Sequence, residues 1–503
     1  MESLSLLMSA IVAIMNPYHL SILFGAVFVG MIVAVLPGIG PTTALAILIP
    51  VTFLVEPAAA LMIFGALYYS AMFGATISAI LLNIPGDSGV ALSAVEGHPM
   101  AKRGQAGVAL GLSAICSFIG ATVSATAFTF LGPAIALWAL SFGPPEYFAI
   151  AMLGLVLAGG LTGKDWLKGY SMIFLGLVIG FVGMDMIDGE QRYTFGVLGL
   201  YDGIPWLPVA IGLFGIAEVL LNLERRGQLE FINAKITLRN IWPSLRDWAE
   251  SAWSIVRGTI QGFFVGMLPG AGAAVATFIA YGTEYRLSRR KERFGNGSIE
   301  GLAAVEAANN SVVGGAFIPT FALGIPGSPF MAVMLGGMLL HGLTPGPTLF
   351  QQTDVIWPFI ASVYVGAVIL LLINLFMIPT FIYIIRVSQR FLNPLIVMLC
   401  ILGVFSVRGQ MFDVWLMLMF GFVGYVLRKL DYPVAPFILA IILSPIAERA
   451  LRQSLMMSRG SLDIFINRPV SAMAFAVVLL FLVGPIITGL WRRFRLSGGK
   501  GET

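Results

Sequence analysis

Two proline–glycine motifs interrupt long apolar runs of this 503-residue sequence, at residues 36–41 and 268–273. Proline removes a backbone donor and glycine disfavours helix, so each motif predicts a break within a buried helix. The freed N–H and C=O groups need partners, which a polar cavity or a bound solute supplies. The residues that we expect to form such a site are Pro37, Gly38 and Gly40 in the first motif, and Pro269, Gly270 and Gly272 in the second.

The helix that restarts after each break is suited to hold a solute that carries carboxylate groups. A helix N-terminus presents unpaired N–H groups and partial positive charge to an anion. Thr42 and Thr43 follow the first break as hydroxyl donors, and Thr277 follows the second. The alternative is that these glycines only allow close helix packing, but the repetition of the motif favours binding.

A second pair of motifs, at residues 83–88 and 324–329, contains the tripeptide Ile-Pro-Gly in each copy. Unwound carbonyls and a carboxylate suit a cation, whereas hydroxyl and amide groups suit substrate oxygens. An ordinary Pro-Gly loop at a helix end is the alternative. We expect Asn83, Ser88 and Ser328 to bind substrate, and Gly86, Asp87 and Gly327 to bind the coupling cation.

Three polar side chains fall inside one apolar stretch: Glu306, Asn309 and Asn310. An amide or carboxylate without a partner is costly at membrane depth. We therefore expect these side chains to face the cavity or to bond between helices, and we count Asn310 among the substrate-binding residues.

The elements that position these residues are membrane-spanning helices. Hydrophobic residues make up 58% of the chain and charged residues 11%, against about 25% charged in soluble domains. This composition predicts an all-α polytopic membrane protein in the lipid bilayer. The net charge of +4 reflects cytoplasmic loops and no nucleic-acid surface. The three histidines offer no Ser-His-Asp triad, so we expect no enzyme. We also expect no cofactor and no metal beyond Na⁺; the coupling ion would be Na⁺ or H⁺.

Matched spacings predict two structural repeats. Gly30 corresponds to Gly262 as Pro37 does to Pro269, and the sequence around Ser70 corresponds to that around Ser311. Expected spans, two of them with a central break, lie at about 19–54, 58–83, 106–131, 144–162, 168–184, 204–222, 258–282, 301–325, 354–385, 392–406, 411–427, 433–447 and 470–490. The expected organisation is a first repeat at 1–223, a cytoplasmic linker at 224–257, a second repeat at 258–450, and an additional span with a cytoplasmic tail at 451–503.

Basic residues predict the sidedness of the loops, because Lys and Arg accumulate on the cytoplasmic side. They flank the 258–282 segment at both ends, which predicts a re-entrant hairpin; the segment at 19–54 should then enter from the opposite face. The repeats are accordingly expected to be inverted, as in many secondary transporters. The basic residues Arg449, Arg452, Arg459 and Arg468 conflict with this scheme, which places them outside.

Six stretches of the chain together resemble the large membrane subunit of the bacterial tripartite tricarboxylate transporters: residues 30–41, 83–86, 97–107, 266–270, 324–328 and 340–347. The resemblance covers nearly the full chain. It implies a permease of the bacterial inner membrane that works with a small membrane subunit and a periplasmic substrate-binding protein. It also implies uptake of carboxylates such as citrate, driven by a Na⁺ or H⁺ gradient, and an elevator-like mechanism is our hypothesis for the movement.

Two alternatives stay open at this point. One is a cation-coupled carboxylate carrier that needs no binding protein, and the other is a membrane-embedded enzyme or assembly subunit. The identity of the acid, the coupling ion and the association of the chain into a homo-oligomer are not determined by these motifs.

Overall fold

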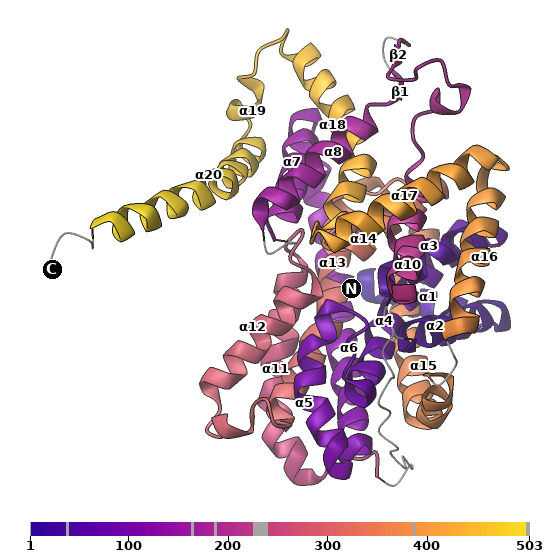
Figure 1. The fold of residues 1–503 in the computed structure, drawn as a ribbon, viewed down its shortest axis with the longest axis vertical. Coiled ribbons are helices and arrows are strands. Elements are labelled where there is room, and N and C mark those ends of the chain that lie inside the picture. The colour runs from indigo at the N-terminus through magenta and orange to yellow at the C-terminus, as the bar shows by residue number, and fades with distance from the viewer. Residues whose placement is uncertain are drawn as a thin grey trace. The chain divides into compact units, whose positions relative to one another are not determined.

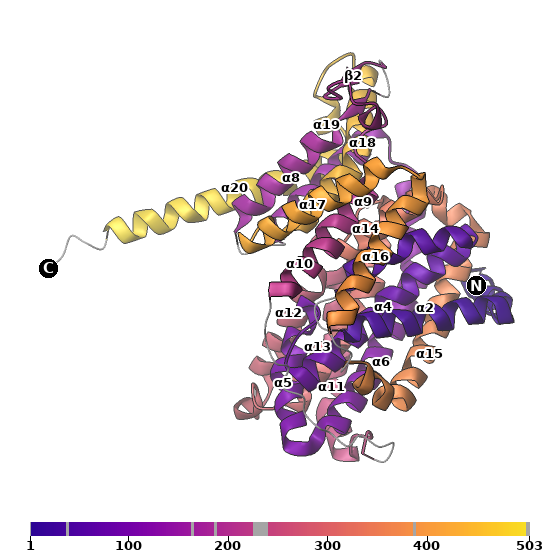
Figure 2. The ribbon, with the colours of Figure 1, turned by 45° about the vertical axis from the view of Figure 1, so that its right-hand side comes forward.

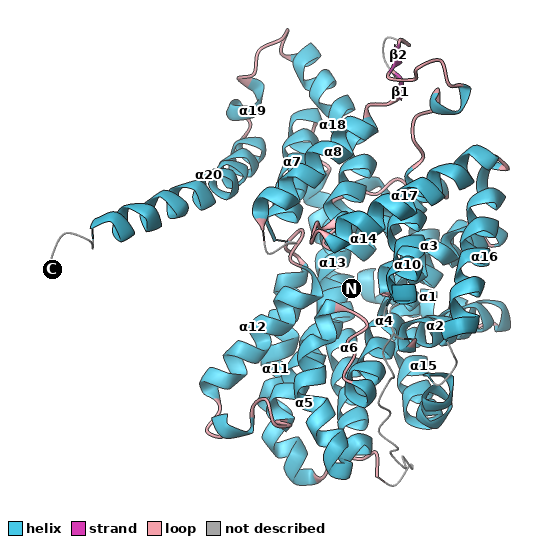
Figure 3. Ribbon diagram, viewed as in Figure 1, coloured by secondary structure: helices cyan, strands magenta, loops and turns pink. Residues whose placement is uncertain are grey.

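The computed structural model describes residues 2–36, 40–161, 165–185, 189–224, 240–385 and 389–498. Two of the expected site residues, Pro37 and Gly38, lie outside these ranges. The chain forms two compact units, each made of two separate stretches of sequence: residues 1–140 with 205–431, and residues 141–204 with 432–503. Both are almost wholly helical (Figures 1 and 3), so the expected all-α class is confirmed.

The first unit contains the segments in which the expected site residues lie. Its helices are α1 (Glu2–Ile14), α2 (Pro17–Val35), α3 (Pro41–Leu48), α4 (Pro57–Leu82), α5 (Ala91–Met100), α6 (Ala106–Ala139), α9 (Trp206–Ala210), α10 (Ala217–Glu224), α11 (Leu245–Gly266), α12 (Gly272–Leu287), α13 (Ile299–Leu323), α14 (Pro329–Leu340), α15 (Thr353–Ile385), α16 (Gln389–Arg408) and α17 (Met411–Lys429). Short 3₁₀ or π segments extend several of them, among them Ile49–Leu54 after α3 and Ser88–Val90 before α5.

The second unit consists of α7 (Pro144–Leu161), α8 (Trp166–Gly180), α18 (Val434–Met457), α19 (Ile464–Asn467) and α20 (Pro469–Gly498), with a short antiparallel hairpin of β1 (Gly183–Met184) and β2 (Gln191–Arg192). Helix α18 continues ten residues beyond the expected end at 447, so Arg449 and Arg452 lie within a helix rather than in a loop. Arg452 contacts Asp185 at 2.7 Å, and Arg468 contacts Glu146 at 3.4 Å. Two of the four basic residues that conflicted with the expected sidedness, Arg452 and Arg468, therefore have their charge neutralised by acidic partners.

Seven helical segments in the described ranges are long and apolar enough to cross a membrane: 17–35, 57–82, 88–139, 206–224, 353–381, 411–429 and 434–457. Helix α13 is not among them, although its 25 residues extend over about 37 Å. It is buried along almost its entire length. The seven apolar helices confirm the expectation of a polytopic membrane protein.

Helix α13 lies at the centre of the first unit, between α6 and α11 (Figures 1 and 2). Three glycines spaced four residues apart, Gly258, Gly262 and Gly266, line the side of α11 that packs on α13. A Cβ atom on any of them would lie 2.3 to 2.4 Å from a carbonyl oxygen of α13. The two backbones approach this closely because the glycines have no side chains, as is common between membrane helices.

The same local contacts occur in both parts of the chain that the sequence motifs match. A Cβ on Gly74 in α4 would meet the carbonyl oxygen of Met31 in α2 at 2.9 Å. Its counterpart Gly315 in α13 would meet the carbonyl oxygen of Phe263 in α11 at 2.2 Å. Position for position, α4 therefore packs on α2 as α13 packs on α11.

Helix α11 begins at Leu245, thirteen residues before the expected start at 258. The C-terminal part of the segment expected as a linker, 224–257, is therefore helical, and residues 225–239 lie outside the described ranges. Ser244 starts the helix: its hydroxyl accepts from the Asp247 N–H at 3.2 Å, and the Asp247 carboxylate accepts from the Ser244 N–H at 2.8 Å. This reciprocal pair is a capping box, which fixes the first turn.

Candidate functional site

Each Ile-Pro-Gly loop follows a long buried helix that ends at a residue in the left-handed conformation. Helix α4 ends at Asn83 (φ 57°), and α13 ends at Gly324 (φ 71°). Each loop then starts a new helical segment with a capping side chain. Asp87 accepts from the Gly89 N–H at 2.8 Å, and Ser328 accepts from the Met331 N–H at 3.3 Å.

The second proline–glycine motif separates two helices that pack against each other as a hairpin. Gly270 (φ 79°) and Gly272 (φ 63°) are both left-handed, a conformation that glycine adopts at little cost. The two arms are antiparallel: Gln261 of α11 contacts Thr283 of α12 at 3.2 Å, and Arg257 of α11 binds Glu284 of α12 at 2.6 Å.

Asn309 lies where the first Ile-Pro-Gly loop meets the tip of this hairpin. Its side chain is fully buried, and neither its Oδ1 nor its Nδ2 atom has a hydrogen-bond partner. A Cβ on Gly89 would lie 2.6 Å from Asn309 Oδ1, 2.7 Å from the Ala273 side chain and 3.1 Å from Asp87 Oδ1. The amide therefore borders two helix starts, one at residues 88–90 and one at α12.

A buried amide with no partner costs about 1–3 kcal/mol, so its retention here needs an explanation. The segment at residues 88–90 packs against α12, which brings two helix N-termini together beside Asn309. Helix N-termini attract anions, and the amide can donate to or accept from a bound solute. The arrangement is suited to binding a small polar solute with negative charge.

The second Ile-Pro-Gly loop contacts α4 through an aromatic residue. Tyr68 Oη lies 3.0 Å from Ser328 Oγ, and the Tyr68 ring stacks on Phe330 with 4.0 Å between centroids. Gly327 in this loop lies against the end of α11, since its Cβ would be 3.0 Å from the Gly266 carbonyl oxygen. Gly86 takes the equivalent place in the first loop, with its Cβ 3.4 Å from the Ala34 carbonyl oxygen at the end of α2.

Glu306 lies one helical turn before Asn309 and Asn310 on α13 and is fully buried. Three hydroxyl groups surround its carboxylate: Ser93 at 2.5 Å, and Thr76 and Ser117 at 3.2 Å. They come from α5, α4 and α6. Among the described residues, no Lys, Arg or His forms an ion pair with this carboxylate.

Comparison with known proteins identifies the family. Residues 20–439 match the model of the tripartite tricarboxylate transporter TctA family. The chain belongs to this family. It is 38% identical over 470 residues to an uncharacterized 52.8 kDa protein in the TAR-I ttuC' 3' region of Agrobacterium vitis, which covers 93% of both chains. It is 36% identical over 223 residues to an uncharacterized protein in the TAR-II ttuC' 3' region of the same organism, which covers 44% of this chain and 92% of that protein. No solved structure matches.

Some predicted site residues of this TctA family member lie near Asn309 and others do not. Asp87 and the N-terminal turn of α12, which begins at Gly272 after Pro269 and Gly270, border it. Gly40 lies against the first loop, because its Cβ would be 3.6 Å from the Gly86 carbonyl oxygen. Asn83 and Ser88 are exposed at the surface of the same loop, and Thr42 is half-buried at the start of α3.

Three other predicted site residues bond within the helix bundle. The Thr43 hydroxyl donates to the Phe214 carbonyl at 3.1 Å, and the Thr277 hydroxyl donates to Ala274 one turn earlier at 3.0 Å. Asn310 donates to Ser117 Oγ at 2.7 Å, and Ser117 also bonds the Glu306 carboxylate. Their binding roles remain predictions.

The sequence motifs did not single out Thr76, Ser93, Ser117 or Tyr68. Each is a single hydroxyl-bearing residue in a helix of apolar or small residues, and its position belongs to no motif or regular spacing. A detectable signal was the buried acid Glu306, because a carboxylate in an apolar span requires partners on neighbouring helices.

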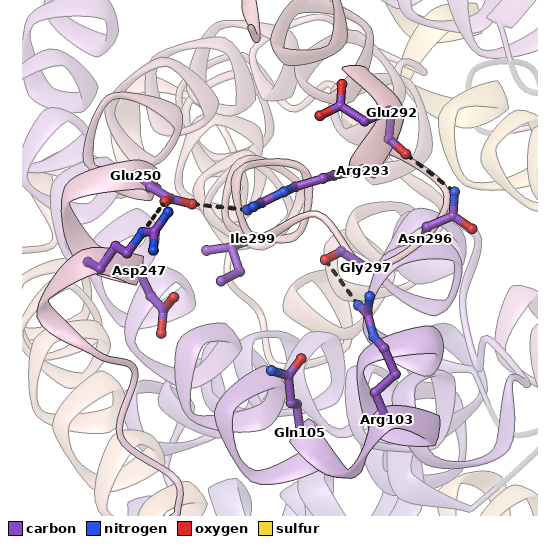
Figure 4. A pocket seen from close by; sticks show the side chains of 10 residues that line it. Arg103, Gln105, Asp247, Glu250, Glu292, Arg293, Asn296, Gly297 and Ile299 are labelled. Carbon is purple, nitrogen blue, oxygen red and sulfur yellow. Dashed lines mark hydrogen bonds and ion pairs between the residues drawn. The ribbon is translucent and has the colours of Figure 1, made fainter. Parts of the chain in front are cut away.

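A separate pocket of about 490 Å³ lies at the polar end of α11, beside residues 292–299 and the segment at 101–105 (Figure 4). Its charged groups bind mainly one another. Glu250 accepts from Arg246 at 3.0 Å and from Arg293 at 3.4 Å. A further hydrogen bond from Arg290, followed by that from Arg246, holds the pKa of Glu250 below its usual value. These paired charges are typical of a solvated surface.

Proposed function

We propose that this chain is the large transmembrane permease subunit of a binding-protein-dependent secondary transporter that takes up tricarboxylates or related carboxylates. A small membrane subunit and a periplasmic substrate-binding protein would be its partners in the bacterial inner membrane, and a Na⁺ or H⁺ gradient would drive uptake. Membership of the TctA family supports the transport class. The observation that carries the substrate proposal is the buried, unpartnered amide of Asn309 between two helix starts.

A carboxylate solute fits this place for electrostatic reasons. Its negative charge would meet the partial positive charge of two helix N-termini, and its oxygens would accept from backbone N–H groups and from the amide. The Asp87 carboxylate lies beside them, so an anionic substrate would bind there together with a compensating positive charge, which a co-transported cation can supply. This requirement is consistent with cation-coupled uptake.

We further propose that the two matched parts of the chain are inverted repeats, each with a re-entrant helical hairpin. The antiparallel contacts between α11 and α12 support a hairpin whose tip reaches Asn309. In each part, the second helix of the break also packs across to the other part: α3 against α14, and α12 against residues 88–90. Such crossed packing favours an elevator-like movement in which both tips travel with the solute.

An uptake assay tests this function. The chain is co-expressed with its two partner subunits in a host that does not take up citrate, and uptake of radiolabelled citrate and other di- and tricarboxylates is measured with and without ionophores. We expect uptake that requires the binding protein and is abolished by collapse of the Na⁺ or H⁺ gradient. Uptake that persists without the binding protein would instead indicate a stand-alone carrier, and uptake that ignores both gradients would contradict secondary transport.

A matched pair of asparagine variants tests the site. Asn309→Ala should lower uptake at least about tenfold, which corresponds to the loss of about 1.4 kcal/mol of solute binding, while the protein stays as stable as the wild type because no internal hydrogen bond is lost. Asn374→Ala is the control, because Asn374 in α15 is also buried with an unpartnered Oδ1 atom. Equal uptake by the two variants would place the solute elsewhere.

A further inference from the structure

The cluster around Glu306 is a second polar site, separate from the loops and the hairpin tip. Glu306, Thr76 and Ser93 are fully buried, and Ser117 is 3% exposed. The Thr76 hydroxyl lies 3.2 Å from both carboxylate oxygens, Ser93 bonds one of them and Ser117 the other. One acidic group is thus held by hydroxyls from three different helices.

The cluster is composed of oxygen atoms and extends to Asn310. Asn310 Nδ2 donates to Ser117 Oγ at 2.7 Å, and Asn310 Oδ1 has no partner. Rotation of this amide by half a turn would exchange the two atoms and add a carbonyl oxygen to the cluster. Carboxylate, hydroxyl and carbonyl oxygens are the ligands that hard cations prefer.

The charge of Glu306 has no basic partner within the described part of the chain. On α5, His98 bonds the Ile80 carbonyl at 2.9 Å, and Glu96 accepts from the N–H groups of Gly295, Gly297 and Ser298. On α11 and α12, Arg257 and Glu284 bind each other. Each of these four titratable side chains is therefore engaged elsewhere.

Four other titratable side chains lie on the elements packed against α13 near this depth. Cys116 precedes Ser117 on α6 and interacts electrostatically with the carboxylate. On α4, Tyr68 bonds Ser328, and Tyr69 is buried without a partner for its hydroxyl. Asp87 lies at the start of the 88–90 segment and caps it. None of them carries a positive charge that could neutralise Glu306.

We propose that Glu306, with Thr76, Ser93 and Ser117, binds the monovalent cation, Na⁺ or H⁺, that drives transport. An ionised carboxylate that is buried without a counter-charge is strongly disfavoured. Glu306 must therefore bind a metal cation, bind a proton reversibly, or stay protonated permanently. The three hydroxyls can donate to the free carboxylate or turn their oxygen atoms to a bound cation. They therefore allow both the empty and the occupied state of the site. The cation site lies one helical turn from Asn309 on the same helix, so its occupation can be sensed at the solute site.

This inference rests on the proposed function for its biological role, but cation binding itself is measurable without any transported solute. The full-length protein, purified with its partner subunits, is unfolded thermally in NaCl and in choline chloride of equal ionic strength, and across a pH series in choline chloride. We expect the melting temperature to rise with Na⁺ if the site binds Na⁺, or to change with pH if it binds H⁺. Glu306→Gln should abolish that response, and Glu306→Asp should retain it in weaker form.

Two further variants make the result specific. Glu284→Gln removes another buried acid, whose partner is Arg257, and should leave the cation response intact. Ser93→Ala removes the shortest hydrogen bond to the carboxylate, at 2.5 Å, and hydrogen bonds to a charged group are among the strongest in proteins. It should therefore shift the cation concentration at the midpoint of the response at least about tenfold. Ser93→Ala and Thr76→Val also serve if Glu306→Gln fails to fold.

The proposal is overturned if the wild type responds to neither Na⁺ nor pH, or if Glu306→Gln responds as the wild type does. The latter result would mean that Glu306 is a permanently protonated structural residue. Cation binding that persists in a protein without carboxylate uptake would leave this site in place and contradict only the proposed substrate.

Discussion

Glu96 shows how one buried carboxylate can organise a loop. It accepts hydrogen bonds from the N–H groups of Gly295 at 2.6 Å, Gly297 at 2.8 Å and Ser298 at 2.6 Å, and from the Tyr281 hydroxyl at 2.6 Å. The three N–H groups belong to the connection that leads into α13. A carboxylate on α5 thus anchors both the second arm of the hairpin and the start of the helix that carries Glu306 and Asn309.

Replacing Glu96 should therefore destabilise the protein far more than replacing a surface acid. Glu96→Ala leaves several donors without their acceptor, at about 1–3 kcal/mol for each one that stays buried, so we expect a loss of about 3 kcal/mol. Glu292→Ala, at an exposed position on the same connection, should change the stability by less than about 0.5 kcal/mol. Thermal unfolding of the two variants compares them, and an equal effect would show that Glu96 does not hold the loop.

Among the elements, the glycine stripe of α11 sets the distance to α13. Gly262→Ala would place a methyl group 2.4 Å from the Ala308 carbonyl oxygen and 2.7 Å from its Cα atom. Because both are backbone atoms, the helices must separate, which costs about 1–3 kcal/mol. Gly282→Ala in α12 is the matched control: its Cβ would meet nothing within 4 Å, and alanine favours helix by about 1 kcal/mol. We expect Gly262→Ala to lower the melting temperature and Gly282→Ala to raise it. An unchanged melting temperature in Gly262→Ala would contradict the close packing.

The hairpin of α11 and α12 makes a prediction about the ends of its arms. Trp253 on α11 and Tyr285 on α12 are exposed near the ends away from the break. Cysteines introduced at these two positions should both react with a membrane-impermeant maleimide added to the same side of the membrane. Labelling from opposite sides would make each arm part of a single crossing, and the re-entrant hairpin would be wrong. The natural cysteines, Cys116 and Cys400, are buried and serve as an unreactive background.

At the scale of the whole molecule, the sidedness of the late spans is directly measurable with reporter fusions. Arg192 and Arg452 both bind Asp185, and Arg192 also binds Glu448. These pairs neutralise the charge of Arg452, so it can lie outside, where the expected scheme puts it. An alkaline phosphatase fusion at residue 460 should therefore be active and a green fluorescent protein fusion there dark, whereas fusions at residue 291 should show the reverse. The same reporter pattern at both positions would refute the topology.

The sequence predicted several long helices of the first unit closely, because proline and glycine mark their ends. The expected span at 58–83 is α4 at 57–82, and that at 301–325 is α13 at 299–323. The start of α11 was missed because residues 245–257 are polar and were assigned to a linker. Polar residues also form helices when one side faces solvent, and the capping box at Ser244 was the available signal.

The candidate site was predictable in outline, but not which of two adjacent amides on α13 borders the hairpin tip. Both Ile-Pro-Gly loops and the second break were found from their motifs, and Asn309 and Asn310 were both expected to face the cavity or to bond between helices, with Asn310 assigned to the substrate. Adjacent residues on a helix point about 100° apart, so the rotation of α13 decides which amide faces the hairpin tip. Since α13 is buried on all sides, no apolar stripe reveals that rotation.

The stack of Tyr68 on Phe330, together with its hydroxyl contact to Ser328, couples α4 to the start of α14. Separating them would forfeit the aromatic contact, about 0.5–1.5 kcal/mol, and a buried hydrogen bond of about 1 kcal/mol. The second Ile-Pro-Gly loop should therefore move together with α4, the helix that leads into the first loop. A fluorinated tyrosine at position 68 would then report, through one resonance, on the displacement of both.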